Sequence, residues 1–153
     1  MQRSVSALAL LVAAGCSPFD GTWLFHVDYQ PSAVNGTCVE DWDSSVVWQG
    51  TDDMFVDIYT TSDHELVVMF EQYLKGEPDG TSFKVSSESI QITDDLQQGD
   101  RVEMRADLEG GTLSGKVTDT SITRHVDSTE SCEVSHKFKA ERSSSNPDRY
   151  AQD

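Results

Sequence analysis

Basic residues are scarce in this chain. Its 153 residues include 11 lysines and arginines against 27 aspartates and glutamates, which gives a formal net charge of −16 at pH 7. No lysine or arginine occurs between residues 4 and 74. A surface of this charge repels the phosphates of nucleic acids and of anionic lipid head groups. We therefore expect no nucleic-acid partner.

Motifs of the common enzyme classes are also missing. The chain has no Gly-x-Ser-x-Gly and no Cys-x-x-Cys, which removes the usual nucleophile and redox patterns. His64 and Glu65 begin like a zinc-protease motif, but position 68 is valine and not the second histidine. Residues 110–116 match a phosphate-binding loop up to Lys116, but Val117 replaces the required serine or threonine. We therefore expect a non-enzymatic protein with no cofactor and no bound metal.

A membrane-spanning segment is not predicted either, although the N-terminus is apolar. Residues 4–14 are mostly alanine, leucine and valine and follow one base, Arg3. At roughly eleven residues this core is too short to span a bilayer, which takes about 20, and it is typical of a signal peptide over residues 1–15. The segment ends in Ala13-Ala14-Gly15-Cys16, which resembles the lipobox of bacterial lipoproteins, with Ala13 where leucine is usual.

The lipobox resemblance implies an address and a partner. Cleavage would precede Cys16, whose sulfur would carry a diacylglyceryl group and tether the chain to a lipid bilayer of the cell envelope. Ser17 in the following position implies the outer membrane if the host is Gram-negative. Ordinary cleavage near Ala14, without a lipid, is the alternative.

Cysteine is nearly absent, and its count agrees with lipidation. The chain has only Cys16, Cys38 and Cys132, so an exported protein would otherwise keep one unpaired thiol. Removing Cys16 leaves two thiols in the oxidising compartment that a signal peptide implies. We therefore predict a disulfide between Cys38 and Cys132.

The remaining chain alternates apolar and polar residues with a period of two, which is typical of strands with one buried face. No amphipathic helical period of useful length occurs. We predict an all-β domain over residues 21–142, built as an antiparallel meander barrel of about eight strands, with a β-sandwich as the alternative. A tether at residues 16–20 precedes it and a disordered tail at residues 143–153 follows it. The predicted strands cover residues 22–29, 45–49, 54–60, 65–71, 82–86 together with 89–93, 101–108, 112–118 and 132–142.

Two residues at the ends of this domain resemble a known family. Gly21-Thr22-Trp23 opens the first predicted strand, and Arg142 closes the last. With the meander of eight strands, this is similar to the lipocalin-like (calycin) barrels. The resemblance implies that Trp23 seals the closed end and that Arg142 lies across it, in a cation-π contact. The other short signatures and the C-terminal helix of many members are absent from this chain.

An eight-stranded barrel is just wide enough either to be filled by side chains or to hold one small ligand. Long connections at residues 30–37 and 119–131 favour an open mouth, at a rim that they share with residues 61–64 and 94–100. This rim would carry the disulfide and face away from the membrane. We expect a small apolar ligand in a pocket with Tyr29, Phe70, Met104 and His136. The alternative is a filled barrel that serves as a structural or protein-interaction module.

Overall fold

The structure is a computed structural model, and it describes residues 17–40, 42, 45–93 and 96–144. The expected signal peptide, Cys16 and residues 145–153 of the expected tail lie outside these residues. The first two residues of that tail, 143 and 144, belong instead to the last strand. Nine strands form one sheet, and a 3-10 helix, η1 (Thr37–Val39), follows the second strand. The strands are β1 (Gly21–Asp28), β2 (Ala33–Gly36), β3 (Thr51–Thr60), β4 (Leu66–Met69), β5 (Tyr73–Asp79), β6 (Ser82–Ile92), β7 (Gln97–Glu109), β8 (Thr112–Arg124) and β9 (Thr129–Ser144).

The sheet closes into an antiparallel barrel of eight strands, β1 and β3 to β9. Consecutive strands of the series β3 to β9 pair with each other, and β1 pairs with both β3 and β9. The ninth strand, β2, pairs with β9 beyond the part that pairs with β1. The predicted all-β barrel is therefore confirmed, and the chain does not form the alternative β-sandwich.

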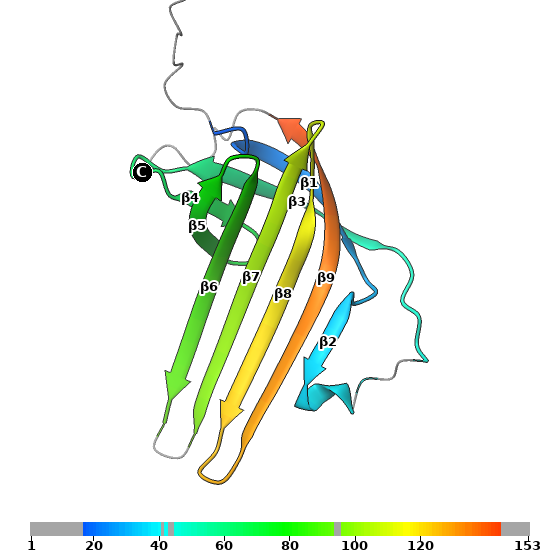
Figure 1. Ribbon diagram of the computed structural model, residues 1–153, viewed down its shortest axis with the longest axis vertical. Coiled ribbons are helices and arrows are strands. Elements are labelled where there is room, and N and C mark those ends of the chain that lie inside the picture. The colour runs from blue at the N-terminus through cyan, green and yellow to red at the C-terminus, as the bar shows by residue number, and fades with distance from the viewer. Residues whose placement is uncertain (1–16, 41, 43–44, 94–95, 145–153) are drawn as a thin grey trace, which may run out of the picture.

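The strands differ greatly in length, and this difference shapes the molecule. Strands β6 to β9 have 11, 13, 13 and 16 residues, whereas β4 has 4. The long strands extend past the short ones as a projecting sheet, with β2 along its edge (Figure 1). The barrel is thus closed at the end where the described chain begins and open at the other end.

The core fills the closed end. Because side chains of a strand alternate between its two faces, one face of β1 buries Trp23, Phe25 and Val27. They pack with buried apolar side chains from β3 to β9 in one cluster, which includes Ile58, Leu66, Val68, Leu74, Phe83, Val85, Met104, Leu113 and Phe138. This half of the barrel is packed with side chains.

Three strand predictions are wrong. Residues 33–36, expected within a connection, form β2, and the other two errors cancel in the count of barrel strands. Residues 45–49 form no strand, and Val47 and Trp48 there are 69% and 53% exposed. Strand β5 is missing from the predicted set, because Gly76 and Pro78 disfavour a strand. Gly76 is needed there, since a Cβ would lie 2.1 Å from the Lys84 carbonyl oxygen. Pro78 lies beyond the residues of β5 that pair with β4, so it interrupts no pairing on that side.

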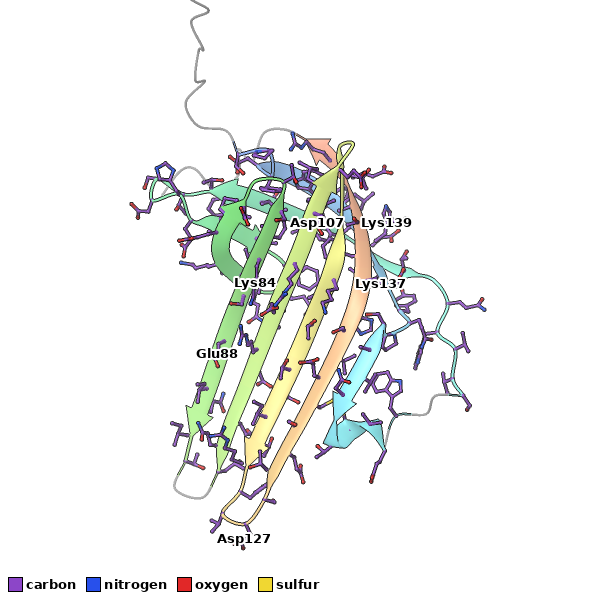
Figure 2. The ribbon with its side chains drawn as sticks, viewed as in Figure 1. Lys84, Glu88, Asp107, Asp127, Lys137 and Lys139 are labelled. Carbon is purple, nitrogen blue, oxygen red and sulfur yellow. A yellow bond between two sulfur atoms is a disulfide. The ribbon has the colours of Figure 1, made fainter. Side chains whose placement is uncertain are left out.

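The predicted connections are also corrected. Residues 61–64 do not share the rim of the disulfide, because β3 is the second barrel strand and runs back toward residue 17. Thr60 Oγ1 donates a hydrogen bond to Asp20 Oδ1 at 2.8 Å. The segment 119–131 is not a long loop, because its ends belong to β8 and β9 and only residues 125–128 turn. Asp127 marks the tip of this hairpin in Figure 2.

Residues 17–20 are more than the expected tether. Phe19 is fully buried and meets the Phe83 ring edge-on, with 5.1 Å between the ring centroids. Its carbonyl oxygen accepts a hydrogen bond of 2.8 Å from Trp23 Nε1. The segment that precedes β1 therefore belongs to the packing of the closed end.

The outer face of the long strands holds an ionic cluster around Glu103. Its carboxylate lies 2.7 Å from Arg105 Nε, 3.1 Å from Lys84 Nζ and 3.1 Å from Arg101 Nη2. Figure 2 labels Lys84 on this face, with Glu88 further along β6. Burial by itself would raise the pKa of the Glu103 carboxyl, but hydrogen bonds from Arg105 and Lys84 hold that pKa below its ordinary value.

We predict that Glu103→Gln lowers the free energy of unfolding by about 1 kcal/mol at neutral pH, since three cations then lose their shared anion. A lowered folded-state pKa stabilises the protein above the ordinary pKa, and this contribution is lost as the pH falls through the folded-state pKa. Urea denaturation at several pH values should therefore show the two proteins converging in acid. Glu88→Gln is the matched control, because Glu88 has no ion pair within the described residues. An equal loss in both variants would contradict the prediction.

Candidate functional site

A cavity of about 490 Å³ lies where the short strands stop and the long strands continue. One wall comes from the ends of β1, β3 and β4, and the facing wall from the inner face of β7 to β9. Apolar side chains from both walls line it, namely Val27, Met54, Phe70, Val102, Val117 and Val134. The cavity thus has an apolar floor that rests on the barrel core.

The inner face of the projecting sheet changes from apolar to polar along the strands. Strand register places Val117 beside Met104 and His136 in one cross-strand row. The next row outward contains Val102, Asp119 and Val134, and the row after it contains Asp100, Ser121 and Cys132. The outermost of these three rows is therefore the most polar.

Aromatic rings form part of the floor. Phe25 stacks on Phe138, with 4.6 Å between ring centroids, and lies 6.4 Å from the Phe70 ring. Tyr29, which is 47% exposed, also lines the cavity. Its ring packs over Gly50, where an added Cβ would lie 3.3 Å from the ring. The cavity therefore offers two aromatic side chains, Phe70 and Tyr29, to a bound molecule.

His136 contributes a hydrogen-bond acceptor. Its Nδ1 lies 2.8 Å from the carbonyl oxygen of Asp28. A carbonyl oxygen only accepts, so Nδ1 carries the hydrogen, and a neutral ring leaves Nε2 as an acceptor. The histidine is held by β1 while its ring lines the cavity.

Four carboxylates surround the opening, from Asp52, Glu71, Asp100 and Asp119, and none of the lysines and arginines that the structure describes lines the cavity. Burial raises the pKa of Asp119, and the charge of Asp100 raises it further. Within the described residues none of these carboxylates has an ion pair or a side-chain hydrogen bond. The opening is therefore strongly negative at neutral pH.

Sequence reasoning located part of this site. The cavity is lined by three of the four residues expected in a pocket, Tyr29, Phe70 and His136. The fourth, Met104, does not line it because it is fully buried in the core beneath. The acidic residues were missed. Asp100 and Asp119 belong to β7 and β8 and share the face of Val102 and Val117, which only strands longer than predicted reveal.

The opposite end of the barrel holds Trp23 and Arg142. Arg142 Cζ lies 4.8 Å from the centroid of the Trp23 ring, and the guanidinium also donates a hydrogen bond to the Pro18 carbonyl oxygen. Trp23 is 1% exposed. The two residues implied by the resemblance to lipocalin-like barrels are thus in contact at the closed end.

Cys38 and Cys132 form a disulfide, as predicted. Cys38 lies in η1, directly after β2. Pairing of β2 with β9 sets Gly36 opposite Cys132 and so brings the thiols together. Gly36 has a φ of +96°, and a Cβ there would lie 2.2 Å from the Ser131 carbonyl oxygen, so only glycine fits.

No group of three metal-binding side chains occurs in the part of the chain that the structure describes. Among the same residues, no helix has both the length and the apolar character needed to cross a membrane. The chain matches no protein-family model, no curated protein and no solved structure.

Proposed function

We propose that this protein is a lipid-anchored, non-enzymatic protein of the cell envelope that binds a small apolar molecule in its open barrel cavity. The observation that carries the proposal is the cavity with its apolar floor. Its volume of about 490 Å³ falls in the range of small-molecule sites, about 300–1,000 Å³. The contact between Trp23 and Arg142 supports the resemblance to lipocalin-like barrels.

The geometry agrees with an anchor at Cys16. Residue 17 lies at the closed end, next to Asp20 and Arg142. The cavity and the disulfide lie toward the other end, where β6 to β9 project (Figure 1). A lipid on Cys16 would then hold the closed end toward the bilayer, in the outer membrane of a Gram-negative host, and leave the cavity facing away.

The pocket is tested with a neutral apolar probe. We expect 1-octanol to bind with a Kd below about 1 mM, which corresponds to roughly 4 kcal/mol, measured by isothermal titration calorimetry. Ser121→Trp fills the opening from the inner face of β8 and should weaken binding at least about tenfold, or roughly 1.4 kcal/mol. Its neighbour Thr120 faces outward, so Thr120→Trp is the matched control and should leave the affinity unchanged. If octanol does not bind, the interaction-module alternative replaces the pocket.

The anchor is tested separately. Cys16→Ala should release the protein from membranes in soluble form, because no diacylglyceryl group can then be attached. Membrane fractions of the host, washed to strip peripheral proteins, are compared for the variant and for Cys38→Ala, which keeps Cys16. Retention of the Cys16→Ala protein in washed membranes would contradict lipidation at this residue.

A further inference from the structure

We propose that the cavity selects an organic cation, an amphipathic molecule with an apolar body and an ammonium group, over neutral or anionic molecules of the same size. The proposal rests on the proposed function, since it assigns the chemical class of the ligand in the same cavity. Three features of the cavity support this selectivity: the charges around the opening, the hydrogen-bonding groups and the aromatic rings.

The carboxylates around the opening form no ion pair with any residue in the described part of the chain. Asp52 and Glu71 come from one wall, and Asp100 and Asp119 come from the facing wall. On the outer face of the same sheet, Glu103 is surrounded by three basic side chains. The three basic side chains around Glu103 thus lie on the outer face, and the carboxylates of the inner face remain available to contact a ligand.

Mutual repulsion makes this arrangement costly without a cation. Asp100 and Asp119 lie in neighbouring rows of the inner face, and the charge of Asp100 disfavours ionisation of Asp119. A positive group between the two walls removes this repulsion. A carboxylate in the same position adds a fifth negative charge and is rejected.

The other polar and aromatic groups favour the same ligand. His136 presents Nε2 as an acceptor when its ring is neutral, so it suits an ammonium N–H. Tyr29 and Phe70 line the cavity with aromatic rings, and organic ammonium groups are attracted to the faces of such rings. The apolar floor below them accommodates the hydrocarbon part. The site thus combines carboxylates, an acceptor and aromatic rings above an apolar floor.

A metal ion does not fit this site. Divalent metals need several ligands within about 2 to 2.6 Å of one point. No three acidic, histidine or cysteine side chains within the described ranges approach closely enough to hold one. An organic cation needs no such convergence, because its charge is diffuse and its body is held by the floor.

The test uses three probes with the same eight-carbon chain: octylammonium, 1-octanol and octanoate, each below its micelle concentration. Calorimetric titration at low ionic strength should give octylammonium about tenfold tighter binding than octanol, and octanoate the weakest binding. Raising the salt to about 0.3 M should reduce the preference for the ammonium, because screening weakens exposed charges.

The double variant Asp100→Asn with Asp119→Asn should lose about tenfold more affinity for the ammonium than for octanol. The matched control is Glu88→Gln with Asp107→Asn, which removes two charges from the outward face of β6 and β7 (Figure 2). This control should leave all three affinities unchanged.

Each outcome decides between the two proposals. If octanol binds as tightly as the ammonium, the cation preference is overturned while the apolar pocket stands. If the inner and outer double variants lose the ammonium equally, the preference reflects net charge and the assignment to this opening is overturned. If no probe binds, both the preference and the pocket are overturned.

Discussion

Replacing Cys38 and Cys132 together by serine should lower the free energy of unfolding by about 4–5 kcal/mol, the largest effect that we expect from any change in this protein. The bond joins positions 94 residues apart. A crosslink over such a loop acts mainly by restricting the unfolded chain. The folded barrel itself should persist, because β2 and η1 lie outside the eight strands that close it.

Urea denaturation with and without a reductant measures this effect. Reduced wild-type protein should unfold at the same urea concentration as the double variant, and the double variant should not respond to the reductant. Alkylation of the unreduced, denatured wild-type protein should find both thiols blocked. A wild-type protein with the same stability in both conditions would contradict the prediction.

Trp23→Ala should lower the free energy of unfolding by about 3–5 kcal/mol, the usual range for deleting a buried aromatic side chain. Trp23 is 1% exposed, and its ring is covered on one side by Arg142 at 4.8 Å. Its Nε1 donates to the Phe19 carbonyl oxygen at 2.8 Å. Truncation therefore leaves a void at the closed end and an unpaired carbonyl group beside it.

Two milder variants separate these contributions. Trp23→Phe keeps a ring but loses the hydrogen bond and should cost about 1–2 kcal/mol. Arg142→Gln removes the cation and should cost about 0.5–2 kcal/mol. Neither should change octanol binding, because the cavity lies at the opposite end. Thermal or urea denaturation measures all three, and a Trp23→Ala loss below that of Trp23→Phe would contradict a packing role.

The two regions should act independently, because the disulfide and Trp23 lie toward opposite ends of the barrel. Distant substitutions usually add within about 0.5 kcal/mol. Combining Trp23→Ala with removal of the disulfide should then lower the free energy of unfolding by about 7–10 kcal/mol. This loss is comparable to the whole stability of a typical domain, about 5–15 kcal/mol. We expect the combined variant to be largely unfolded at 37 °C.

The alternation of apolar and polar residues was sufficient to predict the fold class. In β1, Trp23, Phe25 and Val27 are buried while their neighbours are not, because a strand exposes successive side chains to opposite faces. The cysteine count likewise predicted the pairing of Cys38 with Cys132. These properties depend on local spacing or on counting, so no knowledge of strand pairing was needed.

The exact set of strands was less predictable from the sequence. The β-branched and aromatic residues at 46–48 look like a strand but form none. Strand β5, in contrast, contains Gly76 and Pro78 and nevertheless pairs with β4 and β6. Pairing with neighbouring strands can hold a segment of low β propensity in the sheet. A segment of high β propensity that lacks such neighbours stays outside it. Residues 61–64 were assigned to the wrong rim of the barrel because the predicted strand at 45–49 was counted before β3, which is in fact the second barrel strand.

Composition, period and cysteine number thus determined an acidic all-β domain with one disulfide. Only the tertiary structure decided what surrounds the cavity. Asp52, Glu71, Asp100 and Asp119 are far apart in the chain, and they meet because the sheet closes through β1 and β9 while β6 to β9 extend beyond the short strands. Barrel closure and unequal strand length are results of long-range pairing, and no local pattern encodes which side chains they bring together.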